Sequence, residues 1–227
     1  MSSSPIVLVH GSYHQPAHYD ELAGRLADLT DSVTVPDIGM LPLTETIALV
    51  QDIVDNASSP PVVVGHSFGG AVAGALHGVR HLVFLSGWVL DVDETAGALL
   101  AKVSAEDPSA GSEFSRALRF SEDGSRAWID PESATSLFYA DCPPEVAARA
   151  VELLRPDTPL NFTLSPIAAE WRNTPSLYVA TRRDRTWPPS LATEFAERCT
   201  NVVSIDTGHS PFLSAPDLVA GIIGDCL

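Results

Sequence analysis

The stretch VVVGHSFGG, residues 62–70, decides the fold because it joins a buried strand to a helix through a very tight turn. Its run of valines predicts a strand buried on both faces. Residues 65–69 fit the pattern G-x-S-x-G, and the small residues AVAGALHG that follow predict a helix. In that context the central serine has a strained backbone, and the flanking glycines leave room for neighbouring chain. We therefore expect the Ser67 hydroxyl to stand above the carboxyl edge of a parallel sheet.

Outward from this stretch, short apolar runs alternate with helical patterns. The predicted strands are Ile6–Val9, Val33–Val35, Val62–Val64, Leu82–Leu85, Leu177–Ala180 and Val202–Ile205. The predicted helices between them are Tyr19–Leu29, Thr44–Asn56, Ala71–His77, Leu191–Cys199 and Ala215–Ile223. Strands that alternate with helices predict βαβ units, and thus an α/β fold with a mostly parallel, doubly wound sheet.

Residues 91–171 break this alternation. They carry helical patterns but no convincing strand pattern, and the clearest helices are Ala96–Val103, Pro131–Phe138 and Pro143–Leu154. A segment of roughly 80 residues is much longer than a single crossover requires. We therefore predict a core of residues 1–90 and 172–227 with an inserted helical cap, or lid, at residues 91–171. The alternative is a set of ordinary crossover helices.

Composition limits the classes of partner. The 227 residues suit one domain, and 29 acidic against 13 basic residues give a formal charge of −16. Phosphates would repel such a chain, so we expect no nucleic-acid partner and no binding to anionic membranes. No apolar stretch approaches the length of a membrane span. The N-terminal MSSSPIVLVHG indicates the start of a strand rather than a signal peptide.

The cysteines indicate a compartment. Cys142, Cys199 and Cys226 are odd in number, far apart and outside any CxxC pair. This predicts free thiols in a reducing cytoplasm. The preference for arginine over lysine and the abundance of alanine favour a bacterial source with a GC-rich genome. The oligomeric state stays open, with a homodimer as one alternative.

A serine becomes a good nucleophile only beside a base that is itself oriented by a third group. His209, in IDTGHSPFL, follows the last core strand and is the predicted base. Asp184, in ATRRDRTWPP, follows the strand before it and is the predicted acid. Asp206 and Asp91 also follow strands and are the alternatives. Asp184 could instead pair only with the arginines of its own loop.

Acyl transfer also needs backbone N–H groups that stabilise an oxyanion. The Phe68 amide, directly after the candidate nucleophile, is the first predicted donor. The second comes from HGSYH, the loop after the first strand, where Gly11 lets the backbone approach a substrate. The Ser12 amide is the predicted donor there, and Tyr13 is the alternative.

A metal site is the remaining interpretation of the histidines in this loop. His10, His14 and His18 are spaced by four residues, as ligands on a helix would be. However, Gly11 and Pro16 interrupt any helix across them, and no carboxylate lies among them. We therefore expect no metal.

The catalytic segments resemble a known family. VLVHGSYH, VVVGHSFGG, YVATRRDRTWP and DTGHSPFLSAP resemble the four catalytic segments of the α/β-hydrolase superfamily. HLVFLSGWVLDVDE and FYADCPPEVAARAVELLRP resemble the fifth strand and lid of its compact branch, which holds plant methylesterases, hydroxynitrile lyases and many bacterial hydrolases. The resemblance covers nearly the whole chain and implies the α/β-hydrolase fold.

The resemblance implies a triad of Ser67, Asp184 and His209, with the Ser12 and Phe68 amides as oxyanion donors. It implies no metal and no organic cofactor. The expected activity is that of a serine esterase, which cleaves a small to medium apolar carboxylic ester through an acyl-enzyme. A methyl ester is one candidate substrate.

Two alternatives share this scaffold. One is a small-molecule receptor without hydrolysis, and the other is a carbon–carbon lyase similar to the hydroxynitrile lyases. Those lyases carry threonine after the histidine of the first loop and lysine after the catalytic histidine. Gly11 and Ser210 stand at these positions here, so no cation is placed to stabilise cyanide and the esterase is favoured.

The cap is expected to contribute an apolar acyl pocket, or else these side chains form only its own core. The predicted pocket residues are Trp88, Phe114, Trp128, Leu137 and Phe138.

Overall fold

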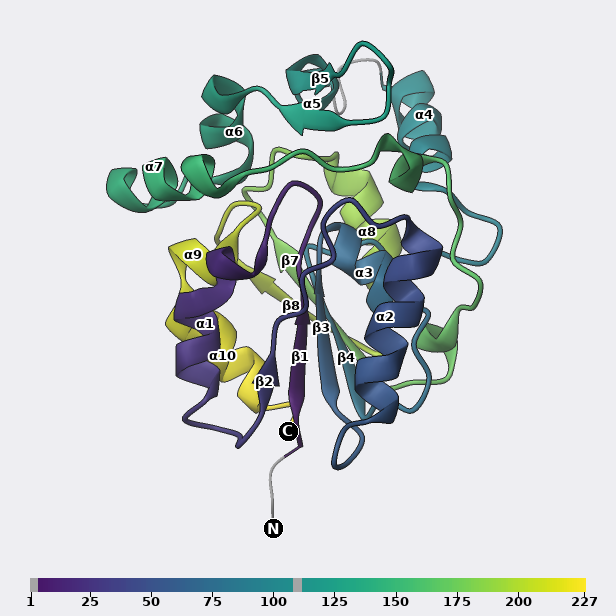
Figure 1. The fold of residues 1–227 in the computed structure, drawn as a ribbon, viewed down its shortest axis with the longest axis vertical. Helices are drawn as coiled ribbons and strands as arrows, with labels where there is room; N and C mark the ends of the chain where they lie inside the picture. Colours follow the sequence, from purple (N-terminus) through teal and green to yellow (C-terminus); the bar gives the residue numbers. More distant parts are fainter. Residues whose placement is uncertain (1–3, 108–111) are drawn as a thin grey trace.

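A sheet of six parallel strands forms the centre of the computed structural model, which describes residues 4–107 and 112–227 (Figure 1). The strands are β1 (Ile6–Val9), β2 (Val33–Thr34), β3 (Val62–His66), β4 (His81–Leu85), β7 (Ser176–Thr181) and β8 (Asn201–Ile205). Their order in the sheet is β2-β1-β3-β4-β7-β8. The predicted α/β fold with a parallel sheet is confirmed, and each predicted strand overlaps an observed one.

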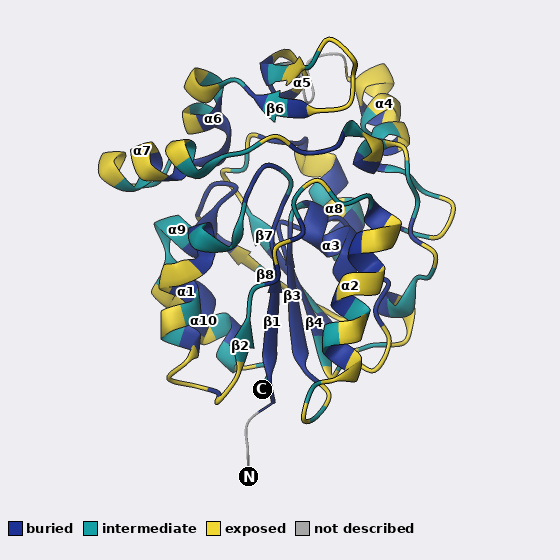
Figure 2. Ribbon diagram, in the orientation of Figure 1, coloured by how far each residue is buried: buried dark blue, intermediate teal, exposed yellow. Residues whose placement is uncertain are grey.

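Helices cover both faces of the sheet, as the buried strands require (Figures 1 and 2). One layer holds α1 (Asp20–Leu26), α9 (Pro211–Ser214) and α10 (Pro216–Gly224), and the other holds α2 (Leu43–Asp55), α3 (Phe68–Ala73) and α8 (Pro189–Glu197). Neighbouring strand residues point to opposite layers: Ile6 and Leu8 pack with α1 and α10, whereas Val7 and Val9 pack with α2 and α3. The inner strands β1, β3 and β4 are therefore mostly apolar and buried, whereas the edge strand β8 is largely exposed.

The order of the strands brings two chain segments together at one edge. The chain leaves β1 for β2 on one side and returns to β3 on the other side, where Val9 pairs with Gly65. The carboxyl ends of β1 and β3 therefore lie side by side at the point where the direction of winding changes. In open α/β sheets, ligands bind at this point.

Residues 91–171, the cap segment, run between β4 and β7. Most of its described residues lie over the carboxyl ends of the strands, whereas its last residues run down beside the sheet towards the start of β7 (Figure 1). Their helices are α4 (Ala96–Glu106), α5 (Ser112–Ala117), α6 (Pro131–Phe138) and α7 (Pro144–Leu153), with the short turns η2 (Pro159–Phe162) and η3 (Glu170–Arg172). A short 3-10 turn, η1 (Pro16–Tyr19), precedes α1 in the core.

The expectation that the cap segment holds no strand is wrong. Strands β5 (Leu118–Phe120) and β6 (Ala127–Ile129) form an antiparallel hairpin. Each has only three residues, too few to show the alternation that identifies a strand in a sequence. The turn between them is held by Asp123, whose carboxylate accepts hydrogen bonds from Ser121 and Ser125.

The three cysteines are unpaired thiols, as predicted. Burial raises the pKa of Cys142 to about 12 and that of Cys199 to about 11, so both stay protonated near neutral pH. Within residues 4–107 and 112–227, no helix is long and apolar enough to cross a membrane. In the same residues, no cluster of His, Cys, Asp or Glu side chains is arranged to bind a metal ion.

Candidate active site

Ser67 lies in the turn between β3 and α3 with a strained backbone, at φ 51° and ψ −121°. Two close approaches explain the flanking glycines. A Cβ on Gly65 would overlap the Gly69 carbonyl oxygen, and a Cβ on Gly69 would overlap the Val9 carbonyl oxygen. The helix begins at Phe68, three residues earlier than predicted, so the turn contains little more than Ser67 itself. The tight strand–turn–helix expected from the sequence is present.

This strain predicts a difference in stability between two replacements of Ser67. Glycine adopts a positive φ without the penalty that a Cβ brings, whereas alanine keeps that penalty. The Ser67→Gly protein should therefore have a free energy of unfolding about 1 kcal/mol higher than the Ser67→Ala protein. Urea unfolding, followed by circular dichroism, measures both. Equal stability, or a less stable glycine variant, would contradict the strain.

His209 and Asp184 form a buried pair at the ends of β8 and β7. The distance from His209 Nδ1 to Asp184 Oδ2 is 2.7 Å, and the side chains are 1% and 7% exposed. The other carboxylate oxygen of Asp184 accepts the Thr186 backbone N–H at 2.8 Å. With Nδ1–H donated to the carboxylate, the lone pair of His209 lies on Nε2, the atom that would act as a base.

The alternative acids lie elsewhere. Asp206 is 63% exposed and forms ion pairs with Arg182 and Arg183, and Asp91 pairs with Arg172. The last arginine of the Asp184 loop, Arg185, pairs with Glu113 of the cap segment. The arginines of this loop therefore have other partners, and Asp184 contacts the histidine.

Ser67 and His209 line one pocket between the core and the cap segment, although no hydrogen bond joins them among the described residues. Its walls are mostly apolar. The lining residues are Ser12, Tyr13, Ser67, Phe68, Trp88, Ala96, Leu100, Phe114, Phe138, Asn161, Phe162, Thr186, Trp187 and His209. The Trp187 ring meets the His209 ring edge-on at 5.2 Å between ring centres.

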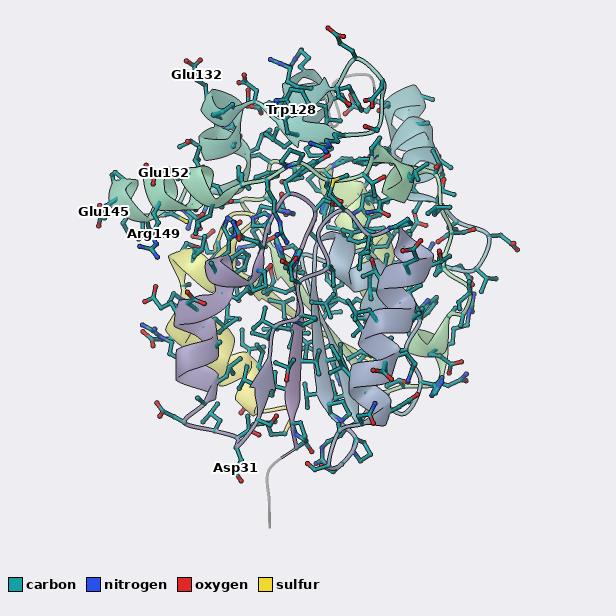
Figure 3. All side chains as sticks on the ribbon, in the orientation of Figure 1. Asp31, Trp128, Glu132, Glu145, Arg149 and Glu152 are labelled. Atoms are coloured by element: carbon teal, nitrogen blue, oxygen red, sulfur yellow. The ribbon has the colours of Figure 1, made fainter. Side chains whose placement is uncertain are left out.

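Only part of the predicted apolar pocket is correct. Trp88, Phe114 and Phe138 line it, but Trp128 and Leu137 do not. Leu137 is buried in the cap segment's own core. Trp128 lies between Ala127 and Ile129 in β6, and both of these face that core, so its ring points to the opposite side. Figure 3 places Trp128 in the cap, and it lines a separate surface hollow there.

Two buried, neutral histidines, His66 and His14, form hydrogen bonds with the loops that carry the site. Burial lowers the pKa of His66 and of His14 well below the usual range. His66 Nε2 donates to the His209 carbonyl at 2.9 Å, and its Nδ1 accepts from the Tyr19 hydroxyl at 2.8 Å. His14 Nδ1 donates to the Ser12 carbonyl at 2.9 Å, and its Nε2 accepts from the Tyr139 hydroxyl at 3.1 Å. Their nitrogens are thus engaged in holding the loops that carry the site.

A buried carboxylate of the cap segment lies against the first loop. Asp157 accepts the Thr158 N–H at 2.7 Å, and its carboxylate faces the Ser12 side chain and the Tyr13 backbone N–H. Burial raises its pKa. The Arg155 N–H donates to the Tyr13 carbonyl at 3.0 Å. Tyr13 has φ 68°, and the Arg155 bond helps to keep it in that conformation.

Sequence reasoning missed the residues with which the cap segment holds these loops. Arg155 bonds to the first loop and the Asp157 carboxylate faces it, while Asp141 Oδ2 accepts the N–H of Gly208, beside His209, at 2.7 Å. Nothing local distinguishes these carboxylates from the other acidic residues of the chain. Their contacts with the site become visible only in the structure, where Asp157 and Asp141 are buried against loops more than 60 residues away in the chain.

His10 predicts how stability depends on pH. Burial lowers its pKa to about 4, while its Nδ1 donates to the Gly11 carbonyl and its Nε2 accepts from the Ile38 N–H. As pH falls below about 6.5, the unfolded chain binds a proton that the folded chain rejects. The free energy of unfolding should therefore decrease between pH 6.5 and 4, by about 1.4 kcal/mol per pH unit for this group.

Urea unfolding at several pH values tests this expectation. The His10→Gln variant should show a shallower pH dependence than the original protein. His77→Gln, at an exposed position, is the control that should leave the slope unchanged. Identical slopes in all three proteins would contradict the assignment.

A comparison with protein families decides the identity. The model of the alpha/beta hydrolase family matches residues 6–222, which is nearly the whole chain. The chain belongs to this family. The superfamily predicted from the catalytic segments is therefore confirmed, and the strand order and the turn at Ser67 show how this hydrolase is built.

Individual relatives agree with this assignment. Alpha/beta hydrolase nvfD of Aspergillus novofumigatus is 25% identical and aligns over 98% of this chain and 96% of its own length. The structure of a pyrethroid hydrolase from Sphingobium faniae JZ-2 superposes with a TM-score of 0.84 at 22% identity, over 98% of this chain and 96% of that one. A methylesterase from Arabidopsis superposes with a TM-score of 0.73 at 16% identity, covering 97% of each chain. The shared fold agrees with the methylesterase-like branch expected from the sequence.

Proposed function

We propose that this hydrolase is a serine esterase that cleaves a small to medium, largely apolar carboxylic ester through an acyl-enzyme. One observation carries the proposal: His209, which is paired with the buried Asp184 carboxylate, lines the same apolar pocket as Ser67, whose backbone is strained. A base oriented by a carboxylate, next to a serine on a tight turn, is the arrangement that activates a hydroxyl for attack on a carbonyl.

In the proposed mechanism, Ser67 Oγ attacks the ester carbonyl while His209 Nε2 takes its proton. Asp184 stabilises the imidazolium that forms. The tetrahedral oxyanion accepts hydrogen bonds from the Ser12 and Phe68 amides. His209 then protonates the departing alcohol, and a water molecule, activated by the same histidine, attacks the acyl-enzyme and releases the acid.

The surroundings of the first loop support Ser12 over Tyr13 as the second oxyanion donor. The Tyr13 N–H faces the Asp157 carboxylate. Its carbonyl is engaged as well, by the Arg155 N–H at 3.0 Å. An amide that stabilises an oxyanion must have its N–H available to the substrate, and the Asp157 carboxylate competes for the N–H of Tyr13.

The walls of the pocket and the relatives support the substrate class. Aromatic and aliphatic side chains, including Trp88, Phe114 and Phe162, surround the candidate nucleophile. Such walls favour an apolar acyl or alcohol group. A methylesterase shares the fold of this chain, which supports a methyl ester as one candidate substrate.

Two positions support hydrolysis over a lyase reaction. A Cβ on Gly11 would lie 2.9 Å from the Ser67 Cβ, so a threonine at this position would crowd the nucleophile. Ser210 follows His209 and is fully buried. It is uncharged, and a hydroxyl offers no positive charge for a departing cyanide.

Labelling with a fluorophosphonate tests the proposal, together with hydrolysis of p-nitrophenyl esters of increasing chain length. We expect a single adduct by intact mass, located on Ser67 by peptide mapping, and turnover that the adduct abolishes. Folded protein that forms no adduct and hydrolyses no ester would overturn the proposal. It would favour the receptor, which a binding screen would then address.

A further inference from the structure

The pocket contains two polar residues that belong neither to the triad nor to the oxyanion loop. Asn161 comes from η2 in the cap segment, and Thr186 follows Asp184 in the core. They are 5% and 4% exposed. Within residues 4–107 and 112–227, Asn161 Oδ1 and Thr186 Oγ1 are buried and have no hydrogen-bond partner. Buried polar groups are normally paired, and each exception calls for an explanation.

The surroundings of Asn161 determine which end of its amide is unpaired. Its Nδ2 donates to the Leu41 carbonyl oxygen at 3.4 Å. If the amide were flipped, Oδ1 would face that oxygen, and two acceptors would repel each other. The group left unpaired is therefore the carbonyl oxygen, a pure acceptor. If Asn161 only helped to hold the fold together, its Nδ2 bond would be enough. Such a role would not explain why the carbonyl oxygen is buried without a partner.

Thr186 is constrained by its backbone. Its N–H donates to Asp184 Oδ1 at 2.8 Å, which fixes the residue next to the triad carboxylate. Its hydroxyl takes no part in that bond and can donate or accept. Phe162 and Trp187, which follow Asn161 and Thr186 in the chain, also line the pocket. Both are aromatic, so they compete little for a hydrogen bond from a polar group of a ligand.

We propose that Asn161 Oδ1 accepts a hydrogen bond from the substrate, and that Thr186 Oγ1 makes a second one. This inference rests on the proposed esterase function. It narrows the substrate to esters whose otherwise apolar acyl or alcohol part carries a hydroxyl or N–H group. An apolar analogue without that group leaves the buried acceptor unpaired, so a site built to bond a hydroxyl discriminates strongly against it.

Matched ester pairs test the proposal. Each pair consists of an apolar ester and the same ester with one hydroxyl, such as the p-nitrophenyl esters of phenylacetate and mandelate. Further pairs place the hydroxyl at other positions of the acyl chain. In another pair, an ethyl ester and the corresponding 2-hydroxyethyl ester, the hydroxyl lies on the alcohol part. We expect kcat/KM to favour the hydroxylated member of at least one pair by about 10- to 100-fold.

Two variants remove the polar atoms while they keep similar volumes: Asn161→Leu and Thr186→Val. In each variant, kcat/KM for the hydroxylated ester relative to that for the apolar ester should fall by about 10-fold or more. Asn173→Leu, the same change at an exposed position in the turn after η3, is the matched control that should keep the preference. No preference in any pair, or a preference that both pocket variants retain, would overturn the inference.

A binding measurement keeps this test independent of catalysis. Benzyl alcohol, 2-phenylethanol and 3-phenylpropanol are titrated against the corresponding hydrocarbons, with tryptophan fluorescence as the signal, because Trp88 and Trp187 line the pocket. Tighter binding of an alcohol that is lost in Asn161→Leu supports the polar contact even if no ester is cleaved. Equal binding of alcohols and hydrocarbons overturns it. Failure of the esterase function is recognised separately, by the absence of a fluorophosphonate adduct.

Discussion

Replacement of Ser67 with alanine is expected to lower kcat/KM for a p-nitrophenyl ester on the order of 10⁶-fold. The variant has no oxygen to attack the carbonyl, so the His209–Asp184 pair has no proton to accept, and the members of a triad act as one unit. Steady-state kinetics at high enzyme concentration, with the background rate subtracted, measure the loss. Fluorophosphonate labelling should disappear in the same variant.

A matched control separates this loss from general damage. Ser204→Ala, at an exposed position of β8, should retain both hydrolysis and labelling. The Ser67→Ala protein should also keep its circular dichroism spectrum, since alanine occupies the same turn. If Ser67→Ala retained a tenth or more of the original activity, Ser67 would not be the nucleophile.

Replacement of Asp184 with asparagine is expected to lower kcat by about 10⁴-fold. Asp184 Oδ1 accepts the Thr186 N–H and Oδ2 accepts His209 Nδ1–H. An asparagine that keeps its oxygen on the Thr186 amide turns its NH₂ group towards His209. The imidazole must then accept at Nδ1 and carry its proton on Nε2, where it cannot take the proton of Ser67.

The control for this prediction is Asp206→Asn, the same change at the acid nearest to His209 in the sequence. Its carboxylate pairs with exposed arginines and should contribute little, so we expect less than about a twofold change in kcat. Steady-state kinetics on one ester compare the two variants directly. A large loss in Asp206→Asn with little loss in Asp184→Asn would exchange the roles of the two acids.

The sheet could be predicted because its signals are local. Apolar runs of three or four residues, separated by helical patterns, predict strands buried on both faces. Boundaries shifted by a few residues: α3 begins at Phe68 and not at Ala71. The cap hairpin was missed because its strands have three residues each.

The candidate site could be predicted because Ser67, Asp184 and His209 each follow a strand of one parallel sheet. The carboxyl ends of such strands meet at a single edge, so the positions of these residues after their strands are enough to bring them together. The structure places Asp184 and His209 in direct contact, and His209 lines the same pocket as Ser67.

The amino-acid sequence by itself determined the parallel sheet, the strained turn at Ser67 and the edge where the candidate triad gathers, because each depends on residues that are neighbours in the chain. Only the tertiary structure decided how the cap segment meets that edge. The Arg155 bond to Tyr13 and the Asp141 bond to Gly208 join segments far apart in the chain, and the unpaired oxygen of Asn161 lies in a pocket that such segments form. The physical reason is burial, because a buried carboxylate or amide oxygen costs free energy unless it accepts a hydrogen bond. Which donor lies within hydrogen-bond distance depends on how the segments pack.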